Sequence, residues 1–200
     1  MSDPRPGHTV LAVPVPVLDD WVRERTRGYD PAWVAADPGF VHAHLTVLAP
    51  WVPAPGPRDL ARVRALVGAV PAFEARLGDV GVFADGLVHL RPEPAEPFAT
   101  LTRLVARAYP DHPPYAGRYG VPEEVQPHLS LDVVGPGPAP HDRPVTPASV
   151  AHDLAGLVPL TSRVDRVDLQ WWQEGRCRLL DSFTLGTGED GAPDSSRRPA

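Results

Sequence analysis

The sequence predicts an α+β fold with two similar lobes, each with an antiparallel-rich sheet and helices outside, around a cleft. Three observations predict it. Strand-like and helix-like patterns alternate along the chain, each half reads strand, helix, strand, helix, strand, and a histidine opens the middle strand of each half, at positions 44 and 128. A repeat of supersecondary units explains this better than chance. We expect residues 1–186 to form a single bilobal domain, with lobes of roughly 8–85 and 86–186 that could exchange strands.

The elements of the first half follow from hydrophobic periodicity. Apolar residues at i, i+3, i+4 and i+7 predict a helix over 57–70, whose Pro57 suits a first turn. Alternating or continuous apolar runs of β-formers predict strands. We expect strands at 8–17, 44–51 and 73–83, and helices at 18–28 and 57–70.

The second half repeats this alternation. Thr146 is a suitable N-cap and Pro147 a suitable first residue for a helix. Residues 135–144 are rich in Pro and Gly and predict a surface connection, while residues 187–200 have almost no apolar content and predict a disordered tail. We expect strands at 86–92, 128–134, 162–172 and 177–186, and helices at 95–109 and 146–158.

Composition narrows the classes of function. The net charge of −6 argues against a long electrostatic track for duplex nucleic acid, but it leaves room for a small phosphate group in a local pocket. A single cysteine, Cys177, excludes an intrachain disulfide. No apolar run approaches ~18 residues, so no membrane segment is expected. No signal peptide is recognised, so we expect a cytoplasmic protein, and a monomer without an obligatory protein partner.

Two short motifs each place a histidine two positions before a hydroxyl residue. Residues i and i+2 of a strand point to the same face, so His44 shares a face with Thr46, and His128 shares one with Ser130. The leucines between them point to the opposite face. If the two lobes face each other, two imidazoles and two hydroxyls converge on one cleft.

This constellation suits phosphodiester chemistry. One neutral imidazole can accept a proton from water or a hydroxyl, and one protonated imidazole can donate a proton to the leaving oxygen. The hydroxyls can hold the non-bridging phosphate oxygens on which charge develops. This chemistry requires no metal or other cofactor.

The sequence resembles the 2H phosphoesterases, the superfamily of 2′–5′ RNA ligases and cyclic nucleotide phosphodiesterases, over most of residues 8–186. Ser130 stands where Thr is commoner, and Ala49 and Trp51 replace a more usual aromatic pair. The likeness rests on LAVPVP (11–16), HLTVLAPWVP (44–53), LVHLRPEPAEPFATLT (87–102), PPYAGRYG (113–120) and VQPHLSL (125–131).

The resemblance implies a pseudo-twofold fold with its site between the lobes, and metal-independent cleavage or reversible 2′–5′ joining of RNA ends. It implies that His44 and His128 are the acid–base pair and that Thr46 and Ser130 bind phosphate. The substrate would be an RNA terminus or a small cyclic nucleotide. For a 2′,3′-cyclic phosphate we expect His128 to activate water and His44 to protonate the leaving 3′-oxygen, roles that exchange in the reverse reaction.

Other residues leave alternatives open. Tyr115, Arg118 and Tyr119 could stack on a base and pair with phosphate, or could belong to a solvated loop. Of Trp171 and Trp172, one ring should be in the core and the other could line the cleft.

Two other functions also fit. An RNA-end binding protein with little turnover would use the same groups. A zinc-dependent hydrolase would use His42, His44 and His128 as metal ligands, although no Cys or carboxylate falls at ligand spacing nearby.

Overall fold

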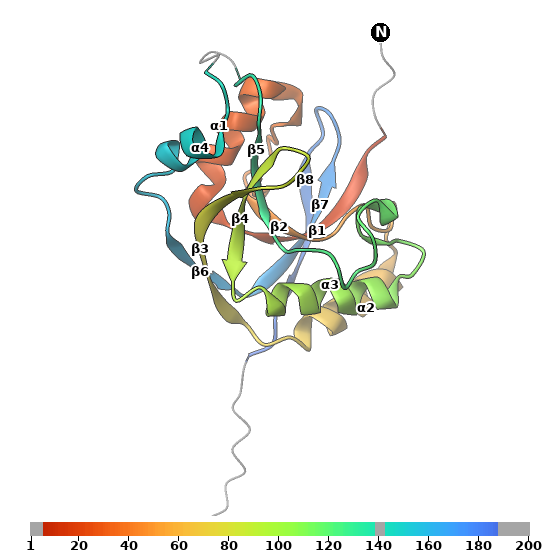
Figure 1. The fold of residues 1–200 in the computed structure, drawn as a ribbon. Coiled ribbons are helices and arrows are strands. Elements are labelled where there is room, and N and C mark those ends of the chain that lie inside the picture. The colour runs from red at the N-terminus through yellow and green to blue at the C-terminus, as the bar shows by residue number, and fades with distance from the viewer. Residues whose placement is uncertain (1–5, 139–142, 188–200) are drawn as a thin grey trace, which may run out of the picture.

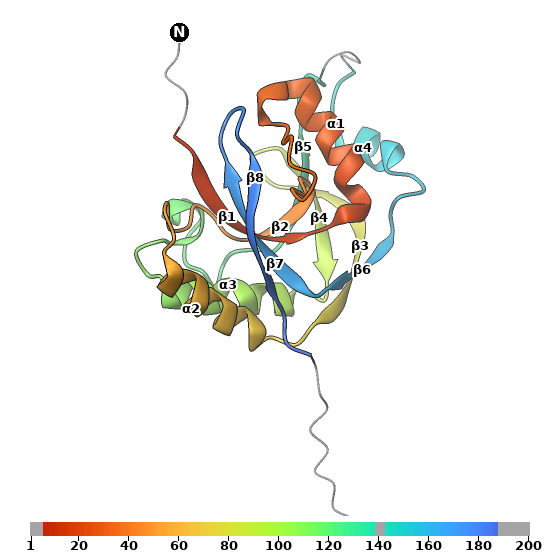
Figure 2. The same ribbon diagram turned by 180° about the vertical axis from the view of Figure 1, so that it is seen from behind.

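The computed structural model describes residues 6–138 and 143–187, whose strands form one curled, eight-stranded antiparallel sheet (Figures 1 and 2). The strand order is β6-β3-β4-β5-β2-β1-β7-β8. The strands are β1 (His8–Pro14), β2 (His44–Leu48), β3 (Phe73–Val82), β4 (Leu87–Glu93), β5 (Leu129–Val133), β6 (Leu160–Val164), β7 (Arg166–Trp172) and β8 (Arg178–Thr184).

The expectation of two separate sheets, one in each lobe, is wrong, because all eight strands belong to one sheet. The strands divide into two groups of four, but β2 and β5 join them through the residue pair Leu45 and Leu129. Both side chains are buried. The ladder therefore continues from one half of the molecule into the other.

The helices lie at two ends of the sheet. Helices α2 (Pro57–Gly68) and α3 (Glu96–Ala108) pack on each other at one end, and α1 (Asp19–Tyr29) and α4 (Pro147–Asp153) lie at the other (Figure 1). Helix α3 buries Phe98, Leu101 and Val105, a spacing that places them on one face. As expected, Thr146 caps α4, because its hydroxyl accepts a hydrogen bond from the backbone N–H of Ser149.

The predicted order of elements is confirmed, with two corrections. The single strand expected over 162–172 is two strands that meet at Asp165: β6 pairs with β3, whereas β7 pairs with β1. The chain crosses there between the two groups of strands, which periodicity cannot reveal because it carries no information about which strand pairs with which. Helix α4 is also shorter than expected, ending at Asp153.

The pairing of the strands does not follow the sequence halves. Strand β3 comes from the first half but lies between β4 and β6, while β7 and β8 continue the sheet beyond β1. Residues 188–200 of the expected tail and 139–142 of the expected Pro/Gly-rich connection lie outside the described residues. Within the described ranges, no helix is both long enough and apolar enough to span a membrane.

The junction between β2 and β5 gives a prediction for stability. Leu129 is fully buried opposite Leu45, so Leu129→Ala should lower the free energy of unfolding by ~2–5 kcal/mol through lost burial and a residual cavity. The partly exposed Leu180 is the control, since Leu180→Ala should change the free energy of unfolding by less than about 0.5 kcal/mol. Urea denaturation measures both. Equal values for the two variants would contradict a structural role for the junction.

Candidate active site

The junction between β2 and β5 brings the two motifs together. Leu45 and Leu129 are directly opposite each other, so in antiparallel register the flanking positions face each other as well. His44 is thereby placed opposite Ser130, and Thr46 opposite His128, on the face away from the two leucines. Each imidazole thus has the hydroxyl of the other motif as its neighbour across the strands.

Both imidazoles are held in the same way by the backbone. His44 Nδ1 lies 2.6 Å from the carbonyl oxygen of His42, and His128 Nδ1 lies 2.8 Å from that of Gln126. A carbonyl oxygen can only accept a hydrogen bond, so Nδ1 must carry the proton in each ring. In the neutral ring, Nε2 then has a free lone pair, and no described residue hydrogen-bonds to either Nε2.

Burial sets the charge of these imidazoles. Burial is the main cause that lowers the pKa of His44 to about 4; the charges of His42 and His128 also lower it, while the hydrogen bond to the His42 carbonyl and the charge of Asp19 oppose the shift. Burial also lowers the pKa of His128, and the charge of Arg91 adds to this, while the bond to Gln126 and the charge of Asp85 oppose it. Burial therefore favours the neutral form of both rings in the free protein.

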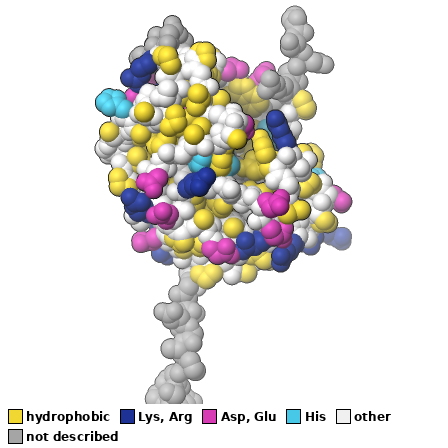
Figure 3. All heavy atoms as spheres, viewed as in Figure 1, with side chains coloured by type: hydrophobic (Ala, Val, Ile, Leu, Met, Phe, Trp, Pro, Cys, Tyr) yellow, Lys and Arg dark blue, Asp and Glu magenta, His cyan; other side chains and the backbone are white. Residues whose placement is uncertain are grey.

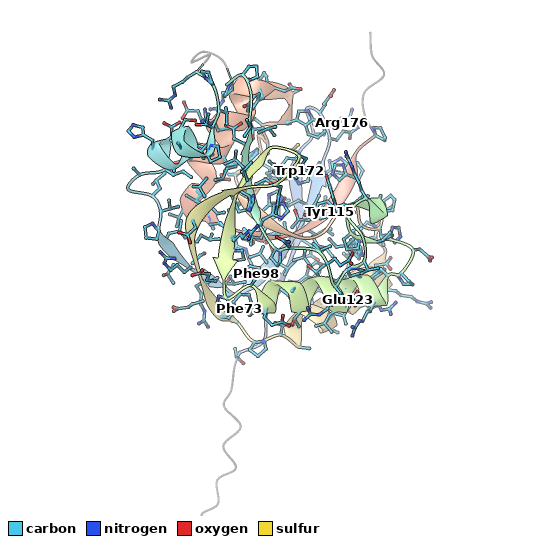
Figure 4. All side chains as sticks on the ribbon, in the orientation of Figure 1. Phe73, Phe98, Tyr115, Glu123, Trp172 and Arg176 are labelled. Carbon is cyan, nitrogen blue, oxygen red and sulfur yellow. The ribbon has the colours of Figure 1, made fainter. Side chains whose placement is uncertain are left out.

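A cavity of about 420 Å³ opens beside His44 and Thr46. Tyr115, Arg118 and Tyr119 all line it, so the structure places these sequence-predicted residues next to the first motif. The remaining lining residues are His8, Val10, Ala49, Pro50 and Trp172. Figure 3 shows histidine side chains near the middle of this face among hydrophobic ones, and Figure 4 labels Tyr115 and Trp172.

Tyr115 links the two motifs. Its ring lies nearly parallel to that of His128, with 6.5 Å between centroids. Burial raises the pKa of its phenol, and a hydrogen bond with Thr46 partly opposes the rise. Its backbone N–H donates to the carbonyl of Ala49 at 2.6 Å. Tyr115 and Ala116 have φ angles of 52° and 54°, a left-handed conformation that is strained for residues with a Cβ.

Of the two tryptophans, Trp172 lines the cavity. Its ring centroid is 5.6 Å from that of His44. The indole Nε1 donates to Gln170 Oε1 at 3.0 Å, and Gln170 Nε2 donates to the carbonyl of Val41 at 2.8 Å. This chain of bonds fixes one wall of the cavity beside the first motif.

His42 is placed for support rather than for binding a metal. Its Nε2 accepts the backbone N–H of Ala35 at 3.1 Å, and its Nδ1 faces Asp19 Oδ1 at 3.7 Å. Both nitrogens are thus directed away from a ligand set with His44 and His128. Across residues 6–138 and 143–187, no three His, Cys, Asp or Glu side chains lie close enough together to hold a metal ion.

Sequence reasoning missed three residues near His128. The His89 ring stacks on Phe83 with centroids 3.8 Å apart and lies 5.8 Å from the His128 ring. His89 Nδ1 is 3.2 Å from the Leu87 carbonyl, but its Nε2 accepts a hydrogen bond from Arg91 Nε at 3.2 Å. The period-2 pattern places His89 and Arg91 on one face, but the register opposite Ser130 that brings them to the site is not readable from the sequence.

Comparison with known proteins now identifies the family. The family model described as the 2'-5' RNA ligase superfamily matches residues 14–176, which is most of the chain. The protein belongs to the 2'-5' RNA ligase superfamily. A comparison with curated proteins gives no match.

Solved structures share the fold of this superfamily member. TT0787 of Thermus thermophilus is 21% identical with a TM-score of 0.52, covering 90% of this chain and 99% of its own. E. coli LigT complexed with 3'-AMP is 19% identical with a TM-score of 0.50, covering 92% and 100%. E. coli LigT complexed with NADP+ is 16% identical with a TM-score of 0.50, covering 93% and 100%.

The left-handed backbone beside the cavity gives a second prediction. Ala116 is exposed at a φ of 54°, so Ala116→Gly should leave the free energy of unfolding unchanged or raise it by up to about 1 kcal/mol. The exposed helical residue Ala61 is the matched control, because Ala61→Gly should lower it by about 1 kcal/mol. Urea denaturation distinguishes the two. A loss of stability in Ala116→Gly equal to that in the control would contradict the left-handed assignment.

Proposed function

We propose that this protein is a phosphodiesterase that acts on 2′,3′-cyclic phosphate or 2′–5′ phosphodiester termini of RNA or of nucleotides. The observation that carries the proposal is the pair His44 and His128, two imidazoles on one face of the sheet with Nδ1 bound to a backbone carbonyl and Nε2 free. Family membership supports the same chemistry.

The proposed step needs only these groups and water. One neutral Nε2 accepts a proton from a water molecule as the water oxygen attacks phosphorus. The bond from phosphorus to the 3′-oxygen breaks, and the protonated second imidazole donates its proton to that oxygen, which leaves a 2′-phosphate and a 3′-hydroxyl. If the 5′-hydroxyl of a second RNA end attacks phosphorus in place of water, the same step forms a 2′–5′ phosphodiester bond as the bond to the 3′-oxygen breaks, and its reverse cleaves that bond.

Thr46 and Ser130 complete the proposed centre. Each hydroxyl lies opposite an imidazole across the β2–β5 junction, so a phosphate between the imidazoles would lie within reach of both hydroxyls. Fixed donors aimed at the non-bridging oxygens stabilise the charge that develops there. We propose that the two hydroxyls hold the phosphate while the imidazoles exchange protons with it.

The pKa of His44 indicates which of the two histidines is the base. Burial is the main cause that lowers the pKa of His44 to about 4, which favours the neutral, proton-accepting form of this ring. We therefore propose His44 as the base and His128 as the acid in cyclic phosphate hydrolysis, which reverses the roles expected from the resemblance. A bound phosphate anion would raise the pKa of both rings.

The walls of the cavity favour a nucleoside beside the phosphate. Tyr115, Tyr119 and Trp172 offer aromatic faces, and bases stack on such faces with little dependence on sequence. Arg118, which lies over the Tyr119 ring, adds a positive charge. E. coli LigT has been solved with 3'-AMP and with NADP+, and we propose that this chain also takes a ligand with a base and a phosphate.

The product of one reaction tests the proposed function. A short RNA ending in a 2′,3′-cyclic phosphate is incubated with the protein in excess chelator, and the product is identified by mass spectrometry and phosphatase sensitivity. We expect a 2′-phosphate from the wild type and a fall in kcat of at least ~100-fold in His44→Ala and in His128→Ala. Arg58→Gln, at an exposed position on α2, should retain full activity.

Other outcomes would contradict the proposal in different ways. Binding of the RNA without any turnover by the wild type would favour an RNA-end binding protein. Activity that appears only when a divalent metal is restored would show a metal-dependent hydrolase. Full activity in either histidine variant would remove that residue from the acid–base pair.

The pKa shifts also predict the pH dependence of the reaction. Catalysis requires one protonated and one neutral imidazole, and the kcat/KM profile reports the pKa values of the free enzyme. Burial lowers both pKa values below 6.5, so the optimum of kcat/KM should lie below pH 6.5, with a tenfold fall per pH unit well above the higher pKa. The kcat profile should shift to higher pH, because bound phosphate stabilises the charged rings. A kcat/KM that rises steadily from pH 5 to pH 9 would contradict the two-imidazole mechanism.

A further inference from the structure

Arg91 belongs to the group of side chains around His128. Its Cζ lies 5.8 Å from the centroid of the Phe83 ring, and Phe83 in turn contacts His128 edge-on with 5.0 Å between ring centroids. Its Nε donates to His89 Nε2 at 3.2 Å. Arg91 follows His89 by two positions on β4, so both side chains share one face of that strand.

His89 holds the guanidinium of Arg91 through a defined tautomer. Its Nδ1 donates to the Leu87 carbonyl, so Nε2 must be the acceptor for Arg91. His89 is fully buried, and stacking on Phe83 fixes the plane of its ring. Gly81 lies opposite His89 on β3, where a Cβ would be 2.9 Å from His89 Nε2, so this glycine leaves room for the imidazole.

The terminal nitrogens of Arg91 are available for a ligand. Among the described residues they make no hydrogen bond or ion pair, whereas seven other arginines there pair with a carboxylate. The hydroxyls of Thr46 and Ser130 carry no charge, and Arg118 lies in the cavity on the His44 side. On the His128 side of the site, the Nε of Arg91 is therefore held by His89, while its two terminal nitrogens are free to bind a ligand.

We propose that Arg91 is a further substrate-binding residue, whose terminal nitrogens bind a non-bridging oxygen of the phosphate beside His128. His89 is its positioning residue. A planar guanidinium with one edge fixed loses little freedom when it binds an anion, and its fork matches the geometry of two phosphate oxygens. This inference rests on the proposed function for the identity of the substrate, but the anion site can be tested without turnover.

The first test compares phosphate binding with turnover. Inorganic phosphate is titrated into the wild type, Arg91→Gln and Arg91→Lys, with NMR shifts of the His128 ring as the readout, and kcat and KM are measured on the cyclic phosphate RNA. We expect the phosphate Kd and the KM to rise by ~10–100-fold in Arg91→Gln. Arg91→Lys should lie between that variant and the wild type, since it keeps the charge but loses the Nε donor. Arg58→Gln is the control and should match the wild type.

The second test concerns His89 as a positioning residue. His89→Leu removes the acceptor and should reproduce much of the rise in phosphate Kd, whereas His89→Gln retains an acceptor oxygen and should restore binding. Circular dichroism reports whether each variant folds. If His89→Leu does not fold, Gly81→Ala replaces it, since the added methyl displaces the His89 ring.

The outcomes separate this inference from the proposed function. A wild type that binds phosphate through Arg91 but leaves cyclic phosphates intact would support the anion site and overturn the function. An active enzyme whose phosphate Kd and KM are unchanged in Arg91→Gln would support the function and overturn the role of Arg91. A wild type that neither binds phosphate nor turns over the RNA would overturn both.

Discussion

The structure depends on the meeting of β2 and β5 at Leu45 and Leu129. Both side chains are buried where the two groups of four strands join. The same pair sets the register of the His44 motif against the His128 motif. With the leucines turned inward, the imidazoles and hydroxyls on either side must lie together on the opposite face. A slip of one residue would turn the chemical groups of one motif into the core. Stability and the proposed chemistry therefore impose the same constraint on these two strands.

The backbone fixes the tautomer that the proposed proton transfer needs. In both motifs the carbonyl two residues before the histidine accepts the Nδ1 proton, so the protein chooses the tautomer without any acidic side chain. Burial favours the neutral form of both rings, and we expect a bound phosphate anion to favour the charged form. His89 shows how specific this arrangement is. It makes the same backbone bond, but its Nε2 accepts a hydrogen bond from Arg91, so we propose that His89 positions this cation, whereas His44 and His128 are proposed to exchange protons.

The sequence predicts much of this because the relevant signals are local. The order of elements and the shared faces of His44 with Thr46 and of His128 with Ser130 follow from periodicity alone. Features set by pairing between distant segments could not be predicted. The single sheet depends on one inter-strand pair, the division at Asp165 depends on which strands β6 and β7 join, and the place of Arg91 beside His128 depends on the register of β4 against β5.

The protonation state of His44 and His128, measured by imidazole ¹⁵N NMR at pH 7, tests the proposed acid–base pair most directly. His44→Gln and His128→Gln assign the resonances, and spectra are recorded before and after addition of inorganic phosphate. We expect both free rings to be neutral and protonated at Nδ1, and phosphate to shift the Nε2 signals towards the protonated value. Rings protonated at Nε2, or charged at pH 7 without phosphate, would contradict the proposal that two free Nε2 atoms carry the chemistry.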